Sequence, residues 1–149
     1  LGGAHGLTHA VKRPDGWKNL GTYNRYQAME FGRFVQKLKD TREPNGDGTM
    51  LDNTFAMHGS ASSSFHLSRN YPIISAGGTN LGFDNGRYLK FGSGNEDNQA
   101  GAGIDTDAGW RGKLENEELP LANLFVTVLQ RLSVETDTFA GYSGTLERV

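Results

Sequence analysis

Residues 20–39 read LGTYNRYQAMEFGRFVQKLK, and the spacing of the apolar side chains predicts a long amphipathic helix packed on a sheet. Asn24 and Gln27 interrupt the apolar side, which predicts a polar contact on the buried face. Arg33 and Lys39 fall away from it, as expected of a solvated face. The apolar stripe consists of Leu20, Tyr23, Phe31, Phe34, Val35 and Leu38.

Downstream of this helix the sequence predicts a turn and three short strands. TREPNGDGT (41–49) combines Pro, Asn-Gly and Asp-Gly, which is typical of a turn. NTFAMHGS (53–60) is expected to form a buried strand, and YPIISAGG (71–78) a second one with proline near its start. RYLKF (87–91) has weaker alternation and is predicted as a third strand.

The rest of the chain predicts a long loop and a second helix. Residues 92–112 are rich in glycine and lack periodicity, so a long exposed loop is expected there. Pro120 is expected to start the helix, because proline fits best at a first helical position. Helix, three strands and helix together indicate a three-layer α/β fold, although three short strands make a small sheet for two helices. The predicted buried stripe of the second helix is Leu121, Leu124, Phe125, Val128, Leu129 and Leu132.

Length and composition limit the class of protein. The 149 residues fit one domain, or the C-terminal part of a larger domain. A net charge of −2 and 36% hydrophobic residues suggest neither a nucleic-acid-binding surface nor disorder. The sequence has no apolar run long enough for a membrane span and no cysteine for thiolate sites. Because the chain opens on Leu1 without a signal-peptide pattern, we expect a processed or truncated product whose upstream part is missing.

Histidines are the first candidates for chemistry. His5 and His9, within AHGLTHAVKRPDGW (4–17), have the i, i+4 spacing of a helical metal-binding pair. The glycines around them argue against a helix, so we expect a loop that presents both imidazoles. His58 ends a predicted strand and His66 lies in the following loop, where ligands bind in open α/β sheets. The ordinary alternatives are exposed loop histidines and a histidine at the edge of the core.

Three further segments are weaker candidates. GSASSSF (59–65) lacks the nucleophile elbow and is interpreted as a polar connection. GGTNLG (77–82) has glycine spacing similar to a phosphate loop but lacks the following Lys and Ser/Thr, so we reject that interpretation. DTDAG (105–109), with Glu96 and Asp97, could offer oxygen ligands to calcium, but a solvated acidic loop explains these residues equally well.

Short segments in a fixed order resemble the HXXSHH family, a bacterial family of unknown function. HGLTHA resembles the motif that names the family, and later segments resemble its helices, turn, strands and tail. The resemblance covers nearly the whole chain and implies that it corresponds to about the last third of a family member. The segments are 5–10, 23–39, 46–60, 71–78, 119–134 and 139–146.

This family looks like a relative of the alkaline phosphatase and sulfatase superfamily. The resemblance implies the C-terminal portion of a three-layer α/β fold with long glycine-rich loops, and an exported protein in the periplasm or outside the cell. Superfamily members place a nucleophile and several metal-binding Asp and His residues at the end of a central sheet, and the metal activates the nucleophile. The nucleophile would lie in the upstream part.

Carried over residue by residue, the first motif looks damaged. His5 matches the first histidine of the family motif, Thr8 its serine and His9 its next histidine. Ala10 stands where the family has its last histidine, and alanine cannot ligate a metal.

The second part of the implied site is also incomplete. His66 matches the first histidine of the family's H-x-H pair, and Ser68 stands at the second. The loop ASSSFHLSRN (61–70) contains no Asp or Glu. A hydrolytic metal site usually has at least three protein ligands, so His5, His9 and His66 are expected to be the remnant of a divalent-metal site. No catalytic residue and no resident cofactor are expected.

We therefore expect a non-catalytic structural or assembly subunit of an exported complex, built on a degenerate hydrolase-like scaffold. Its partners would be other protein subunits or its own upstream segment, and neither nucleic acid nor a membrane span is expected. The alternative is a metal-dependent phosphate- or sulfate-ester hydrolase, active only with its upstream segment, in which Thr8 orients a ligand. A third hypothesis is a carbohydrate- or surface-binding module that stacks sugars on Trp17, Trp110 and Tyr142.

Overall fold

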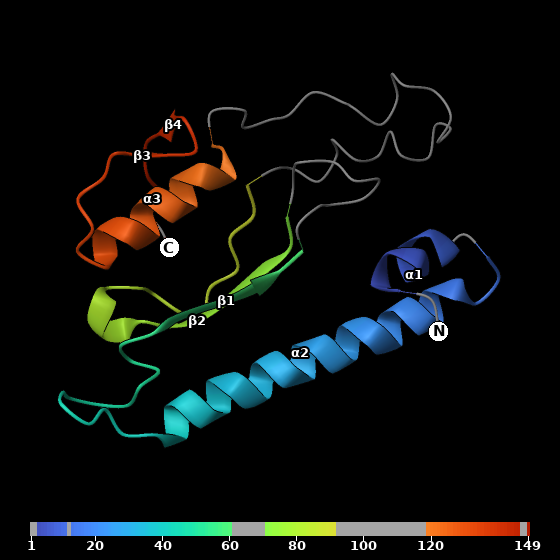
Figure 1. The fold of residues 1–149 in the computed structure, drawn as a ribbon, viewed down its shortest axis with the longest axis horizontal. Helices are drawn as coiled ribbons and strands as arrows, with labels where there is room; N and C mark the ends of the chain where they lie inside the picture. Colours follow the sequence, from blue (N-terminus) through green and yellow to red (C-terminus); the bar gives the residue numbers. More distant parts are fainter. Residues whose placement is uncertain (1–2, 12, 61–70, 92–118, 147–148) are drawn as a thin grey trace. The chain divides into compact units, whose positions relative to one another are not determined.

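The computed structural model describes residues 3–11, 13–60, 71–91, 119–146 and 149. These residues belong to two compact units, residues 1–51 and 52–149, and each is described by itself. The first unit contains α1 (Ala4–Ala10) and the long α2 (Gly16–Asp40), drawn in blue to cyan in Figure 1. The second contains the strands, the short 3-10 helix η2 (Thr79–Leu81) and α3 (Leu121–Arg131).

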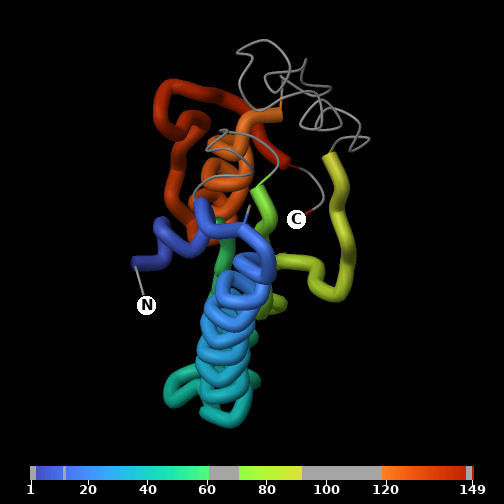
Figure 2. Tube along the Cα trace, turned by 90° about the vertical axis from the view of Figure 1, so that its right-hand side faces the viewer, coloured from blue at the N-terminus to red at the C-terminus, as the bar shows by residue number. Residues whose placement is uncertain are grey.

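Helix α2 confirms the long helix predicted from the sequence and begins four residues earlier than predicted, at Gly16. It runs without interruption over 25 residues, as the tube in Figure 2 shows, and Leu38 of the predicted stripe is buried. The expected polar contact is present, because the Gln27 side-chain amide donates to the Tyr23 hydroxyl oxygen at 2.7 Å. Phe34 departs from the prediction, since 51% of its surface is exposed.

The turn predicted after α2 is also confirmed. Arg42 and Thr49 form an antiparallel bridge, and the Glu43 backbone N–H donates to the Gly48 carbonyl at 3.2 Å. Gly48 has a φ of 83°, a left-handed conformation that glycine adopts without steric cost.

Two of the three predicted strands are observed. β1 (Phe55–Gly59) and β2 (Ile73–Gly77) form an antiparallel pair in which Phe55 lies opposite Gly77. The expectation that β1 is a buried strand is wrong, because Ala56 is its only buried residue and Met57 is 40% exposed. A two-stranded ribbon cannot cover both of its faces, which explains the exposure.

The prediction of a third strand at residues 87–91 is wrong. Residues 87–91 form no strand, and Tyr88 is 87% exposed. Instead, β3 (Thr138–Phe139) and β4 (Tyr142–Ser143) form a second small antiparallel sheet next to α3. Ala140 and Gly141 connect these strands with φ angles of 51° and 82°, as a tight hairpin turn requires.

Helix α3 begins one residue later than predicted and confirms only part of the predicted stripe. Pro120 is the N-cap, and Leu124 is buried as expected, whereas Leu132 is 46% exposed. Thr127, a polar residue, is also buried on the inner face of α3. Its hydroxyl can be buried because it accepts a hydrogen bond from the Leu146 N–H at 2.8 Å. The buried residues of α3 are Ala122, Asn123, Leu124, Val126 and Thr127.

An aromatic stack connects the elements of the second unit. The rings of Phe55 in β1 and Phe83 after η2 are stacked with centroids 4.2 Å apart. Arg131 at the end of α3 places its guanidinium carbon 4.6 Å from the Phe83 ring centroid and donates to the Gly82 carbonyl at 2.6 Å. The described residues thus form a mixed helix-and-strand fold with two small antiparallel sheets.

No helix among the described residues is both long and apolar enough to cross a membrane.

Candidate functional site

The two N-terminal histidines lie together on one helix. The prediction of a loop at this point is wrong, because residues 4–10 form α1. His5 and His9 therefore lie one turn apart on the same face, with their Nε2 atoms 3.1 Å apart. Their rings meet edge to face, with centroids 4.6 Å apart, and both residues are exposed.

Packing explains why α1 forms despite its glycines. Glycine inside a helix costs only about 1 kcal/mol relative to alanine, and tertiary contacts can offset that cost. α1 packs against the start of α2 in the first unit, and the two are joined by a tight turn in which the Arg13 N–H donates to the Ala10 carbonyl at 3.0 Å. Asp15 continues the turn with a φ of 60°, directly before buried Gly16.

Gly16 permits the close approach of the two helices. A Cβ atom at this position would lie 1.8 Å from the Ala10 carbonyl oxygen. The backbones can meet there only because residue 16 has no side chain.

We expect Gly16→Ala to detach α1 from α2. The added methyl group leaves no room for the Ala10 carbonyl, so α1 must shift and lose its packing. Hydrogen exchange should show lost protection at the α1 amides, with the second unit unchanged. Gly21→Ala is the matched control, since nothing lies within 4 Å of its added Cβ, and it should stabilise α2 by up to about 1 kcal/mol. Unchanged α1 protection in Gly16→Ala would contradict this account.

The remaining residues of the first motif do not extend the pair. The Thr8 hydroxyl donates to the His5 backbone carbonyl at 2.7 Å and not to an imidazole, unlike the ring-orienting role expected for it. Ala10 contributes its carbonyl to the turn. Among the described residues, no three His, Cys, Asp or Glu side chains form a group that could hold a metal.

Of the other two histidines, His58 lies among the described residues. His58 lies in β1 opposite Ile74, half-buried, in an antiparallel sheet, so the rule for parallel strand ends does not apply to it. His66 and Ser68 lie outside the described residues, as do most of the serine segment 59–65 and all of the loop 92–112 with its acidic residues. Of the three predicted ligands, His5 and His9 thus lie in the described part of the chain, and the three-residue set that a hydrolytic metal centre needs stays a prediction.

The glycines of segment 77–82 have a structural role in the turn through η2. Gly78 and Gly82 have φ angles of 71° and 83°, and a Cβ atom on Gly78 would lie 2.6 Å from the Phe83 ring. The Phe83 N–H donates to the Gly78 carbonyl at 3.0 Å, which closes the turn. The glycine spacing therefore serves the turn that places Phe83 in the core.

The two candidate sugar-stacking residues that the structure describes are exposed and belong to separate units. Trp17 in α2 is 62% exposed, with the Lys18 ammonium 5.8 Å from its ring centroid. Tyr142 in β4 is 56% exposed, and Trp110 lies outside the described residues.

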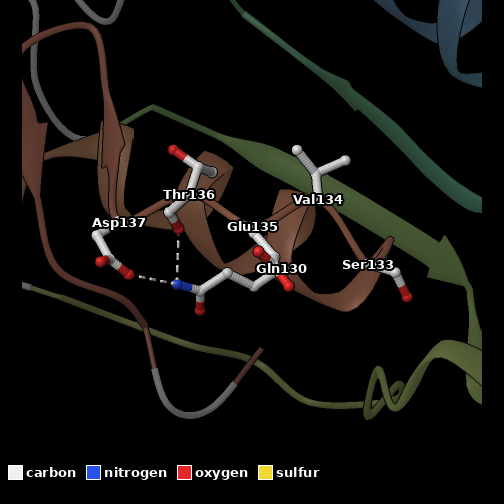
Figure 3. Close-up of a pocket in the computed structure, with 6 residues that line it drawn as sticks. All are labelled: Gln130, Ser133, Val134, Glu135, Thr136 and Asp137. Atoms are coloured by element: carbon white, nitrogen blue, oxygen red, sulfur yellow. Dashed lines mark hydrogen bonds between the residues drawn. The ribbon is translucent and has the colours of Figure 1, made fainter.

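Sequence reasoning missed an open groove after α3. The Gln130 amide donates to the Thr136 carbonyl at 2.8 Å, and its nitrogen lies 3.5 Å from an Asp137 carboxylate oxygen, as Figure 3 shows. Ser133 has a φ of 62°, and the Val134 N–H returns to the Leu129 carbonyl at 2.9 Å, which terminates the helix. The mainly polar segment SVETD (133–137) after an apolar helix is the sequence signal for this groove. The contacts in the groove cap α3.

Compared with family models, curated proteins and solved structures, the chain matches none of them.

Proposed function

We propose that this chain is a non-catalytic structural or assembly subunit of an exported protein complex. In this proposal it is a degenerate hydrolase-like scaffold of the HXXSHH type, and its helices and ribbons belong to a larger three-layer α/β fold. The two-ligand histidine pair and the two-stranded sheets support an incomplete site and an incomplete sheet. The periplasm or the extracellular space remains the proposed location.

The exposure of large apolar side chains is the observation that carries the proposal. In the described part of the chain, fifteen large hydrophobic residues are exposed, whereas six hydrophobic residues are buried and two of those are alanines. Exposed apolar groups that gather on one side of an element are typical of surfaces that pack against other protein.

Helix α2 shows the pattern most clearly. Tyr26 and Met29 are 60% and 47% exposed and lie three residues apart on one side of the helix. At 100° per residue, this side is opposite the stripe that contains Leu20 and Leu38. A helix that carries apolar groups on two opposite faces is expected to pack on both, so Tyr26 and Met29 are proposed to contact another subunit.

We expect the chain to self-associate through this side of α2. Sedimentation velocity over a wide concentration range should show a rising weight-average mass. Tyr26→Ser with Met29→Ser should raise the dissociation constant at least about tenfold, because aromatic anchors dominate interface energies. Asn24→Ser with Lys39→Ser is the matched control, since both positions are exposed and polar on the same helix and, at 100° per residue, lie away from the side of Tyr26 and Met29. A chain that remains monomeric throughout, or a double variant that associates like the control, would contradict the proposal.

The short distance between His5 and His9 favours a second candidate, a metal-dependent phosphate- or sulfate-ester hydrolase completed by an upstream segment. In that case His66 would complete the ligand set, and the metal would activate a nucleophile supplied by that segment. The protein from its natural source would contain stoichiometric zinc, manganese or calcium and would hydrolyse p-nitrophenyl phosphate or sulfate. If the protein from its natural source contains no bound metal, this candidate is excluded.

A further inference from the structure

We propose that His5 and His9 on α1 form, by themselves, a two-nitrogen chelate for Cu²⁺ or Zn²⁺. Both imidazoles are exposed and stand one helical turn apart, so an ion can reach them from solvent. The site needs no third protein ligand and does not depend on the assembly proposed above.

The distance between the two nitrogens fits a chelate. Metal–imidazole bonds of about 2.0–2.1 Å place two nitrogens about 2.9 Å apart at a 90° angle and about 3.3 Å apart at the tetrahedral angle. The observed distance between the Nε2 atoms of His5 and His9 is 3.1 Å, between these two values. The distance therefore suits both square-planar and tetrahedral ions, and a bound ion would replace the hydrogen bond that joins the two rings.

The helix supplies the arrangement before any ion binds. Two histidines at i and i+4 are held on one face, which is why this spacing binds zinc in helical metal sites. The contact between Ala10 and Gly16 holds α1 against α2, so the pair sits on a packed element. A chelate on a preformed helix loses less conformational entropy on binding than two histidines in a flexible segment.

The donor atoms select the class of metal. Two neutral imidazoles favour copper, zinc and nickel, whereas magnesium and calcium require oxygen ligands. In the Irving–Williams order Cu²⁺ binds more tightly than Zn²⁺ to the same donors. Water would fill the remaining coordination positions.

The test uses the full chain without a polyhistidine tag, stripped of metal with a chelator and titrated with Cu²⁺ alone. Electron paramagnetic resonance should show coupling of the copper to two nitrogens at one equivalent, and calorimetry should give a one-to-one stoichiometry. Zn²⁺ should displace Cu²⁺ only in excess, and bound ion should increase hydrogen-exchange protection of α1. Coupling to a single nitrogen, or no saturable binding, would overturn the proposal.

A register variant tests the spacing itself. His9→Ala with Ala10→His keeps the composition but moves the second imidazole from i+4 to i+5, off the face of His5. The affinity for Cu²⁺ should fall at least about tenfold, because the second ligand no longer binds intramolecularly. His5→Asn should give the same loss with α1 otherwise unaltered. Wild-type affinity in either variant would overturn the proposal.

Two further variants locate the site. His58→Asn and His66→Asn should bind Cu²⁺ with wild-type affinity, since neither residue belongs to the pair. If His66→Asn loses as much affinity as His5→Asn, the two-nitrogen site is wrong and the three-ligand site of the hydrolase candidate is favoured. The assembly proposal is tested separately by sedimentation, so its failure leaves these binding measurements unaffected.

Discussion

Replacing Phe83 with alanine is expected to lower the free energy of unfolding of the second unit by about 3–5 kcal/mol. Phe83 is 5% exposed, and its ring stacks on Phe55 of β1 with centroids 4.2 Å apart. The Arg131 guanidinium carbon lies 4.6 Å from the same ring centroid. Truncation therefore removes the contact shared by β1 and α3 and leaves a cavity between them.

Urea unfolding followed by circular dichroism, with hydrogen exchange at the amides of β1 and α3, measures the effect of Phe83→Ala. Tyr88→Ala is the matched control, because it also truncates an aromatic ring, but at a position that is 87% exposed. The control should change stability by no more than about 0.5 kcal/mol. Equal unfolding midpoints for the two variants would show that the Phe83 ring does not hold the unit together.

Long helices with a periodic apolar stripe can be predicted well from sequence, because many residues follow the same spacing. The stripe of α2 repeats over five turns, so single departures such as Phe34 do not alter the assignment. β1 and β2 were placed to within two residues, since short apolar runs between turn formers leave few alternatives. The sequence pattern could not predict how exposed β1 and β2 are, because their exposure depends on how many strands the sheet contains.

Helix α1 forms against the local propensity of its residues, which is why the sequence predicts a loop there. The glycines near His5 lower helix propensity, but docking against α2 through Gly16 outweighs them. The i, i+4 spacing indicates that His5 and His9 form a pair. The short distance between their rings follows only from the helix that contains them. The three-residue ligand set remains a prediction, because His66 lies outside the described residues.

The hairpin β3–β4 was missed because its turn has an unusual sequence. Ala140 adopts a φ of 51°, a position where Asn, Asp or Gly is the usual signal. Residues 87–91 were wrongly predicted as a strand on alternation alone, but a strand also needs a hydrogen-bonded neighbour. Short segments thus depend on partners that the sequence pattern does not reveal.

The second large effect is expected for Gly78→Ala, which should destabilise the second unit by about 2–4 kcal/mol through backbone strain and overpacking together. Gly78 has a φ of 71°, and its added Cβ atom would lie 2.6 Å from the Phe83 ring. The ring cannot retreat easily, because Phe55 stacks on it and Arg131 lies against it. Urea unfolding measures the loss.

Gly82→Ala separates the two causes. Gly82 has a similar φ of 83°, but nothing lies within 4 Å of its added Cβ atom. Its substitution should therefore cost only the left-handed strain, about 1–2 kcal/mol. A loss as large as that of Gly78→Ala would contradict a steric role for Phe83.

Combining Gly78→Ala with Phe83→Ala completes the test. Once the ring is removed, the new methyl group has no aromatic neighbour, so the added cost of Gly78→Ala should fall to that of Gly82→Ala. The two substitutions should then be non-additive by about 1–2 kcal/mol in a double-mutant cycle. Additive losses would mean that strain at Gly78 acts alone, and that the glycine serves the backbone of η2 and not the packing of Phe83. A combined loss smaller than the sum of the single losses would instead show that the glycine and the aromatic ring are required together.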